Sequence, residues 1–472
     1  MARDCIICGQ RAHSGEHVFP AALGGRRTNK GIYCGKHNNG FSPLAAILAE
    51  QLRLINTLLS VRADRSNVPH SFAFDTPSGE SYILSANAIA LKPPSLKETV
   101  VGSSREVTMQ FSTQAQADAW IAEQRAAGND VRITATEKGK KYFSEPLQIQ
   151  LKLGGREGLR AIGYVALTFF AHHFPTEARQ LGMLRFKTFV QGAGEDQFVW
   201  WDSPDSFNGL PSTPFKFGHT VALGVSASRS EAYARISLFS ALNFAVRLGA
   251  VDTPSDRTVI VHINPQAECA PNDISEVREN ALVFEVNRPP SLTANLGEMI
   301  GSGLAQESIQ LLFNRISAWN LDRTIRPVLD ELNSIRDLDE DERNKRVKVI
   351  VDREGQRVLN LMRYVVDGLK QNFKANAMMA KLVPSLDALV AADETSSTGL
   401  SQPASDALGV AKARLAEEIG RHLSSNDLDL DTLSMLLGGG PGAALVGEAM
   451  VGLILQRLRD SHKTATEGEY VL

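Results

Sequence analysis

The sequence predicts a multidomain α+β protein with a small N-terminal module, a central α+β domain and a C-terminal helical region. The chain has 472 residues, which is more than one ordinary domain of about 100–200 residues. Three of its four cysteines fall within the first 34 residues. Strand-like and helix-like patterns are mixed up to about residue 290, and helical periodicity dominates afterwards. We therefore expect domains over residues 1–65, 66–290 and 291–472.

The composition is that of a globular protein whose charge is unevenly distributed. Hydrophobic residues make up 43% of the chain and charged residues 22%, enough for a sizeable core. The net charge of −3 argues against a protein whose whole surface binds nucleic acid. The first forty residues hold six basic and two acidic side chains, a balance of +4, which leaves −7 for the rest. This basic segment indicates local contact with phosphate groups.

Nothing in the sequence resembles a signal peptide or a membrane span. The first ten residues, MARDCIICGQ, lack the apolar core of a secretory signal. The most apolar stretch, residues 161–171, is much shorter than the about 20 residues that a spanning helix needs. We expect a cytoplasmic protein without membrane contact. Clustered cysteines in that reducing compartment indicate a metal site rather than disulfides.

Two pairs of potential metal ligands frame the first forty residues. Two residues separate Cys5 from Cys8, two separate Cys34 from His37, and 25 residues lie between the pairs. Such pairs can close a tetrahedron of sulfur and nitrogen around Zn²⁺. A structural zinc ion would keep this segment folded, since the segment has no evident core of its own. The alternative is four unrelated residues, three of them buried thiols.

Further motifs follow in a fixed order between and after these pairs. They are the stretch EHVFP (16–20), the pair Gly24-Gly25, Asn29, and Asn38 directly after the second ligand pair. This pattern resembles that of the zinc-containing HNH nucleases, which have a ββα-metal (treble-clef) fold. The match covers about 40 of the 472 residues. It implies an endonuclease that hydrolyses DNA phosphodiester bonds with Mg²⁺ or Mn²⁺, in addition to the structural zinc.

The resemblance also implies a role for each of these side chains. His17 would be the general base, since imidazole titrates near pH ~6.5, and Asn29 would hold its ring in orientation. Glu16 and Asn38 would bind the catalytic divalent ion through oxygen atoms. The sequence leaves Asn39 open as an alternative to Asn38.

Two positions depart from the family pattern. Most relatives have Asp where this chain has Glu16, and the longer side chain would shift the metal or weaken its binding. His37 replaces the usual fourth cysteine, which zinc tolerates.

Basic side chains surround the proposed catalytic ion. We expect them to contact DNA phosphates, although solvated loop charges are the simpler alternative. These residues are Arg26, Arg27, Lys30 and Lys36.

The central region is predicted to begin with a helix and to continue as an α+β domain. Ser42 is a candidate N-cap and Pro43 a candidate first helical residue, followed by an apolar stripe of helical spacing. We expect a hairpin over residues 71–84 and a βαβ unit over 106–136. Further strands are expected at 147–153, 186–190, 197–201, 219–225, 232–239 and 258–263, with a helix over 160–170.

Two pairs of adjacent residues in this region invite a functional interpretation. We interpret His172 and His173 as packing or capping residues near a helix end. Trp200 and Trp201 could stack on bases, but neighbours on a strand face opposite ways, so one buried tryptophan is the ordinary outcome.

The C-terminal region is predicted to be helical over residues 305–335 and 355–383. The charged run 336–349 is most simply a solvated helix junction, and 392–406 is typical of a linker. The last apolar helix could contact a regulatory protein partner or mediate self-association.

Three functions compete at this point. The first is an HNH endonuclease whose remaining chain serves targeting or regulation. The second is a non-catalytic zinc-binding module that binds nucleic acid or protein. The third is a nuclease effector of a defence-type system, in which the acidic remainder senses a signal.

Overall fold

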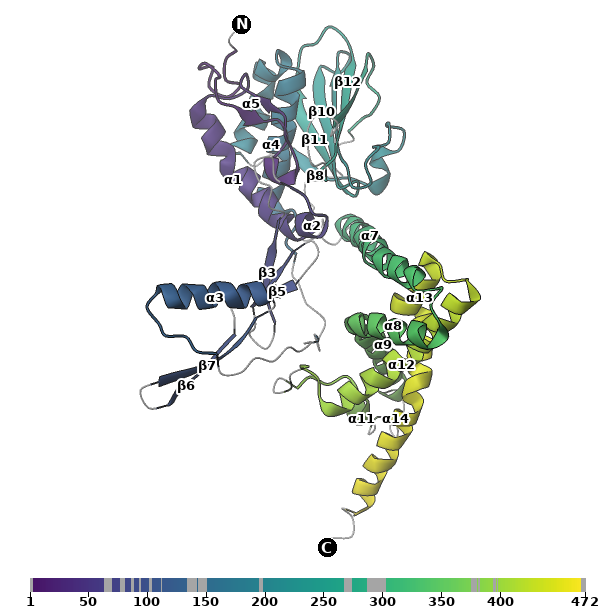
Figure 1. Ribbon diagram of the computed structural model, residues 1–472. Coiled ribbons are helices and arrows are strands. Elements are labelled where there is room, and N and C mark those ends of the chain that lie inside the picture. Colours follow the sequence, from purple (N-terminus) through teal and green to yellow (C-terminus); the bar gives the residue numbers. More distant parts are fainter. Residues whose placement is uncertain are drawn as a thin grey trace. The chain divides into compact units, whose positions relative to one another are not determined.

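The computed structural model is a mixed helical and sheet protein with several regions, as the sequence predicts. The chain divides into two compact units, Met1–Asn129 with Ile149–Ile316, and Asp130–Gln148 with Ser317–Leu472 (Figure 1). The segment with the predicted metal ligands therefore shares its unit with the central sheet. The described residues are 3–62, 70–76, 81–85, 89–92, 95–101, 104–111, 113–133, 142, 151–194, 198–266, 274–286, 303–374, 380, 383–393, 396 and 398–467.

The N-terminal segment consists of two short antiparallel strands followed by a helix. The strands are joined by a 3-10 helix and a Gly-Gly turn, where a Cβ on Gly25 would lie 2.0 Å from the carbonyl oxygen of Phe19. Only glycine fits this turn, because no side chain can occupy that space. The elements are β1 (Glu16–His17), η1 (Ala21–Leu23), β2 (Thr28–Asn29), α1 (Gly35–Gln51) and α2 (Arg53–Leu58).

Helix α1 begins earlier than the sequence predicts. Ser42 is not its N-cap: the cap is Cys34, and Pro43 lies inside the helix. The turn that joins Cys34 to His37 is itself helical, so the helix is already formed when the chain reaches Ser42. Pro43 then removes only one backbone donor from the helix.

The core of this unit is a six-stranded antiparallel sheet in the order β13-β12-β9-β10-β11-β8. Four of the predicted strands are confirmed, whereas β11 and β13 were not predicted. The central strand β9 is buried over its whole length. The strands are β8 (Val199–Trp201), β9 (His219–Ser226), β10 (Glu231–Leu238), β11 (Leu242–Ala250), β12 (Arg257–Ile263) and β13 (Ile274–Glu279).

Both faces of the sheet are covered, which explains its largely apolar strands. Helix α4 (Gly155–His173) packs on one face, and α1 packs in turn on α4 (Figure 1). A cluster on the sheet that includes Trp200 is covered by Phe284 and Val286. Trp200 is thus the buried tryptophan of its pair.

The predicted strand at residues 186–190 is wrong, because this stretch belongs to helix α5 (Leu184–Val190). Phe186, Phe189 and Val190 are buried at helical spacing, so three apolar residues face the core without an extended chain. Short 3-10 turns complete the region: η2 (Glu177–Arg179), η3 (Leu181–Met183) and η4 (Pro204–Phe207).

Two small sheets and a helix lie between α2 and α4 in the chain. The predicted hairpin is confirmed, since β3 (Phe72–Asp75) pairs with β4 (Ser81–Leu84), which also pairs with β5 (Ile89–Leu91). The βαβ unit does not form in the described residues. Its first strand, β7 (Ser104–Gln110), instead pairs antiparallel with β6 (Ser95–Val101), and α3 (Gln114–Ala126) is followed by no strand at 131–133. Residues 134–136 and 147–150 lie outside the described residues, and 151–153 are not a strand.

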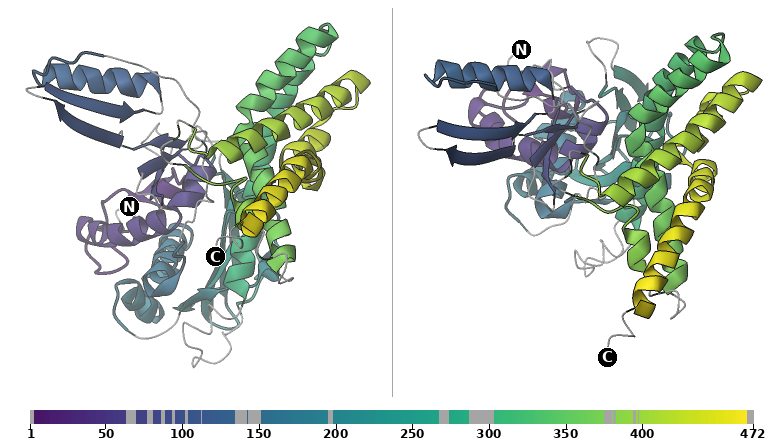
Figure 2. Two further views of the ribbon diagram at one scale, coloured as in Figure 1. Left: turned by 90° about the horizontal axis from the view of Figure 1, so that it is seen from below. Right: turned by 60° about the horizontal axis from the view of Figure 1, so that its bottom comes forward.

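The second unit is helical, as predicted. An apolar core that includes Leu332, Val358, Leu415 and Val446 holds its helices together, and α12 and α14 lie side by side (Figure 2). The elements are α7 (Leu304–Ser334), which begins in the first unit, α8 (Glu340–Arg353), α9 (Gly355–Lys374), α11 (Val383–Asp387), α12 (Gln402–Ser425), α13 (Leu430–Gly438) and α14 (Gly440–Glu467).

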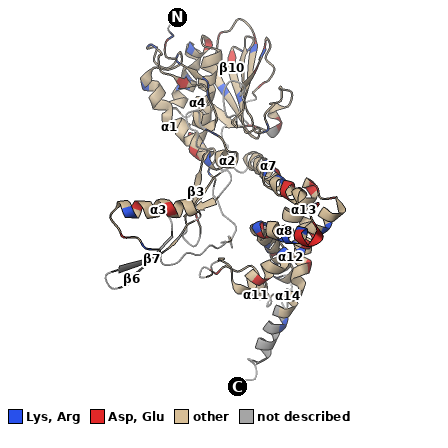
Figure 3. Cartoon of the chain, viewed as in Figure 1, with Lys and Arg blue, Asp and Glu red and all other residues tan. Residues whose placement is uncertain are grey.

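Two predictions for this unit need correction. The charged run at 336–349 is mostly helix α8, whose first turn is acidic and is capped by Asp339 (Figure 3). The predicted linker ends at Ser401, which caps α12. Among the described residues no single helix could span a membrane; only the bent pair Leu430–Gly438 with Gly440–Gln456 has the necessary length and composition.

Candidate metal centre

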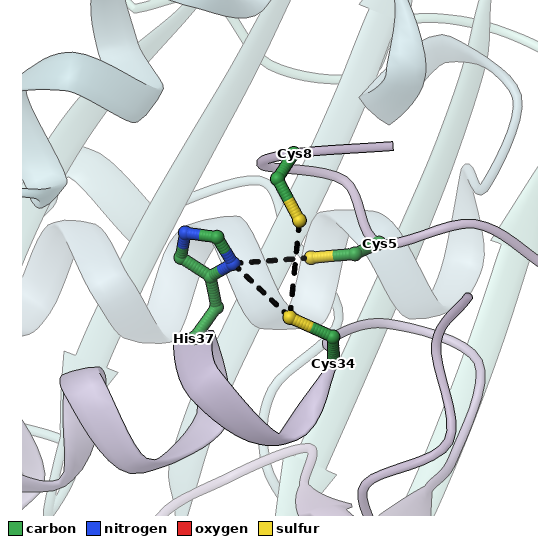
Figure 4. Close-up of side chains that lie close together, drawn as sticks. All are labelled: Cys5, Cys8, Cys34 and His37. Carbon is green, nitrogen blue, oxygen red and sulfur yellow. Dashed lines mark hydrogen bonds between the residues drawn. The ribbon is translucent and has the colours of Figure 1, made fainter. Parts of the chain in front are cut away.

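The four predicted zinc ligands converge at one point. Cys5 and Cys8 come from the N-terminal loop, whereas Cys34 and His37 come from the start of α1 (Figure 4). Their ligand atoms all lie within 4.8 Å of one another. Two backbone hydrogen bonds close the turn that contains Cys5 and Cys8. The N–H of Gly9 donates to the carbonyl of Cys5, and the N–H of Cys5 donates to the carbonyl of Gln10.

The distances suit a tetrahedral ion. Zinc with Zn–S bonds of about 2.3 Å and a Zn–N bond of about 2.0 Å places sulfurs about 3.8 Å apart and sulfur about 3.5 Å from nitrogen. The Cys8 and Cys34 sulfurs are 3.8 Å apart. The Nδ1 atom of His37 lies 3.6 Å from the Cys5 sulfur and 3.2 Å from that of Cys34. This Cys₃His cluster could therefore hold a metal ion such as zinc.

The position of Cys34 favours the thiolate that a metal requires. Cys34 caps α1, and the backbone N–H of His37 lowers the pKa of its thiol to about 6, with a further contribution from the His37 ring. A helix N-terminus stabilises negative charge in this way. At neutral pH the thiol is therefore largely ionised even before a metal binds.

Glu16 lies in a buried setting between the N-terminal segment and α4. Its side chain accepts a hydrogen bond from the hydroxyl of Tyr164, and only 8% of the residue is exposed. Burial raises the pKa of the Glu16 carboxyl, although Tyr164 and the neighbouring His17 favour ionisation. A bound cation would restore the charged form, because it supplies the compensation that the apolar surroundings lack.

His17 and Asn29 lie on the paired strands. The backbone register sets Glu16 opposite Asn29 and His17 opposite Thr28, and β1 ends at His17, which is half-buried. Neighbouring side chains on a continuous strand point to opposite faces of the sheet. Because β1 ends at His17, this rule does not force the side chains of Glu16 and His17 apart. The orientation of His17 by Asn29 stays a prediction.

The Asn29 side chain makes two hydrogen bonds of its own. Its Oδ1 atom accepts from the backbone N–H of Gly31 at 2.7 Å, and its Nδ2 lies 2.8 Å from Nδ1 of His172. Burial and then the positive charge of Arg27 lower the pKa of His172, so a neutral ring can accept from the amide. His172 thus contacts a residue of the candidate site, whereas the sequence suggests only packing or capping.

Asn38 presents an oxygen with unused hydrogen-bonding capacity. Its Oδ1 atom is buried and has no hydrogen-bond partner among the described residues, while Asn39 is exposed. A buried amide oxygen without a donor is costly and needs an explanation. Of the two asparagines, Asn38 is therefore the better candidate ligand.

The predicted phosphate-binding residues differ in their surroundings. Arg27 forms an ion pair with Glu276 of β13 at 3.2 Å, so it is held in place rather than free in a loop. Arg26 is half-buried, whereas Lys30 and Lys36 are exposed.

One face of α4 binds the N-terminal segment, a feature that the sequence analysis missed. Tyr164 bonds to Glu16, Thr168 lies 3.0 Å from the hydroxyl of Tyr33, and His172 lies beside Asn29. The three α4 residues recur every four positions and so share one face of the helix. Their polar character within an otherwise apolar stretch was the available signal.

The fold and the site define a mixed helical and sheet protein with a Cys₃His cluster at its N-terminus. No family model, curated protein or solved structure matches the chain.

Proposed function

We propose that the first unit is a divalent-metal-dependent endonuclease of the HNH type that hydrolyses DNA phosphodiester bonds. The observation that supports it most is the buried Oδ1 atom of Asn38, which has no partner among the described residues. It belongs to α1, which follows an antiparallel strand pair that carries Glu16 and His17. The first cysteine pair, the strand pair and the helix that begins at the second ligand pair follow one another as the HNH resemblance implies.

In this proposal Glu16 and Asn38 hold a Mg²⁺ or Mn²⁺ ion, which would stabilise charge on the cleaved phosphate. His17, which is half-buried at the end of β1, takes the proton from the attacking water. Tyr164 acts as a positioning residue, because its hydroxyl fixes one carboxylate oxygen of Glu16. A zinc ion held by Cys5, Cys8, Cys34 and His37 would fix the start of α1 to the N-terminal loop.

The alternative is a zinc module that binds nucleic acid or protein without cutting. One observation favours it: Glu16 and Asn29 both have structural partners, Tyr164 for the first and Gly31 with His172 for the second. Under this alternative the two residues join α4 to the N-terminal segment and have no chemical role.

Plasmid cleavage by the full chain separates the two functions. We expect nicking with Mg²⁺ or Mn²⁺ by the wild type, and a loss of at least a hundredfold in His17→Ala. His13→Ala is the matched control, since His13 is an exposed histidine of the same segment whose Nδ1 atom lies 3.1 Å from a backbone oxygen. Equal cleavage by all three proteins would reject the proposal, and binding without cleavage in either metal would favour the non-catalytic module.

A further inference from the structure

A carboxylate of the edge strand β13 holds two arginines from distant parts of the chain. Glu276 lies 3.2 Å from Nη1 of Arg27 and 2.6 Å from Nη2 of Arg278. The ring of His173 is also near, with Nδ1 3.9 Å from the same carboxylate. Burial opposes the charge of Glu276, but the hydrogen bonds from Arg278 and Arg27 contribute to a pKa that is lowered overall. Glu276 therefore stays ionised and fixes both guanidinium groups.

Two more guanidinium groups lie at the same end of the N-terminal segment. The Arg3 side chain packs against Gly31, where an added Cβ would lie 3.4 Å from Arg3 Cδ. Arg179 donates to the carbonyl of Gly31 at 2.8 Å and to that of Asp4. Gly31 itself donates to the side chain of Asn29, so these cations border the candidate site.

The charges at this place do not cancel. Four arginines, namely 3, 27, 179 and 278, outnumber the two carboxylates of Asp4 and Glu276, and Arg179 also lies near the thiol of Cys5. His172 lies among them: burial lowers its pKa first, and the charges of Arg27, Arg278 and Arg3 lower it further. The ring is therefore neutral and does not add to the excess.

The arginines differ in how much of each remains available. Arg179 is committed to backbone carbonyls, and it joins the N-terminal loop to the helical turn η2. Arg27 donates to Glu276 through Nη1, and Arg278 donates to it through Nε and Nη2. Their side chains are nevertheless 39% and 65% exposed, so part of each guanidinium is not committed to Glu276. A guanidinium fork that is already fixed in place matches the oxygen pair of a phosphate.

We propose that Arg3, Arg27 and Arg278 form a phosphodiester-binding subsite beside the metal centre, and that Glu276 preorganises it. The ligand is a nucleic acid backbone phosphate next to the one that is cleaved, since the backbone of Arg27 bonds to Val18, the residue after His17. The edge of the sheet thereby becomes part of the nucleic acid path. The subsite extends the proposed nuclease function, but it concerns binding and can be tested without cleavage.

The test is the salt dependence of binding to fluorescein-labelled single-stranded and duplex DNA and to RNA of the same sequence. Anisotropy is recorded with the full chain without added Mg²⁺. Loss of one phosphate contact reduces the magnitude of the slope of log K against log salt by ~0.9 for duplex DNA and ~0.7 for single strands, and weakens binding about five- to tenfold at ~0.1 M salt. We expect this change in Arg278→Ala, and recovery of the slope in Arg278→Lys, which keeps the charge.

Arg247→Ala is the matched control. Arg247 is an exposed arginine of the same sheet that pairs with Glu231. It lies on β11, four strands from β13 and thus about 19 Å away at about 4.8 Å per strand. Its replacement should leave the slope unchanged. Zinc content and thermal unfolding of every variant verify that the fold is intact.

The outcomes of this test and of the cleavage test are distinct. Equal affinity and slope in Arg278→Ala and Arg247→Ala would overturn the subsite, as would a wild type that binds none of the three nucleic acids. If Arg278→Ala reduces the slope but wild type and His17→Ala cleave DNA equally, the subsite is retained and the proposed nuclease function is rejected. His17-dependent cleavage with an unchanged slope would do the reverse.

Discussion

The buried His219 should make the stability of the first unit depend on pH. Its Nε2 atom donates to the carbonyl of Leu23, and its Nδ1 accepts from the backbone N–H of Phe239. The ring is fully buried, and burial lowers the pKa of His219 to about 3. Both nitrogens are therefore used by one neutral tautomer, which ties the N-terminal segment to the sheet.

The sign of the effect follows from the two states. In the unfolded chain the histidine pKa is about 6.5. Below that pH the unfolded state binds a proton at this histidine, whereas in the folded state the ring stays neutral. The contribution of His219 to the free energy of unfolding is fully present above about pH 6.5, and it is lost as the pH decreases toward 3. Between pH 7.5 and 5.0, the loss from a shift of this size is about 2 kcal/mol, at about 1.4 kcal/mol for each pH unit below 6.5.

The perturbation is His219→Gln. Glutamine can still donate to Leu23 but cannot titrate, and the lost acceptor for Phe239 costs about 1–3 kcal/mol at pH 7.5. We expect the stability difference between wild type and variant to shrink by about 2 kcal/mol on going to pH 5.0. Other buried histidines such as His262 contribute equally to both proteins and cancel in the comparison.

The assay is urea unfolding followed by tryptophan fluorescence. In a Trp120→Phe, Trp319→Phe background, the two tryptophans that remain of the four are Trp200 and Trp201, both in strand β8. The fluorescence then reports on the sheet that contains His219. A difference between the two proteins that stays constant from pH 7.5 to 5.0 would refute the reasoning, because it would mean that His219 titrates alike in both states.

Four further substitutions test the metal centre, the turn beside it and helix α1. Cys34→Ser should remove the bound zinc and unfold the N-terminal segment, measured as zinc per chain by mass spectrometry and as faster proteolysis there. If Glu16 binds the divalent ion as proposed, Tyr164→Phe should weaken Mn²⁺ binding about tenfold or more in calorimetry, because the Glu16 carboxylate loses the hydrogen bond that fixes its orientation, while zinc content stays the same. Gly25→Ala should destabilise the unit by about 1–3 kcal/mol in urea unfolding, because its Cβ would lie 2.0 Å from the carbonyl oxygen of Phe19. Gly40→Ala in α1 is the control: its Cβ would meet no atom within 4 Å, and the substitution should stabilise the unit by about 0.5–1 kcal/mol.

Short-range patterns in the sequence were the most informative. The four ligands of the cysteine cluster come from two local pairs, and their spacing alone predicts that they converge. Strands such as β9 and β12 were predictable because each is a compact run of apolar and β-branched residues.

The errors arise where the surroundings override a local preference. Ser42 has the residue type of a cap, but the ligand pair Cys34 and His37 starts the helix earlier. The stretch 186–190 has a strand-like composition, yet its three buried residues pack equally well from a helix.

Contacts between distant parts of the chain could not be predicted. Tyr164 meets Glu16, and His172 meets Asn29, across 148 and 143 residues. A single sequence shows that α4 has polar positions every four residues but not which segment they face. Arg278 belongs to a strand that the sequence analysis did not predict, so its proximity to Arg27 depends wholly on the pairing of β12 with β13.

The regularly spaced Tyr164, Thr168 and His172 of α4 limit how this protein can be dissected. A fragment that ends near residue 65 would lose all three partners and would expose Phe19 and Leu23, which are buried here. Such a peptide would be a poor surrogate for the intact protein, whatever its metal content. The smallest fragment worth expressing should continue through the segment that closes the far side of the sheet, at about residue 286.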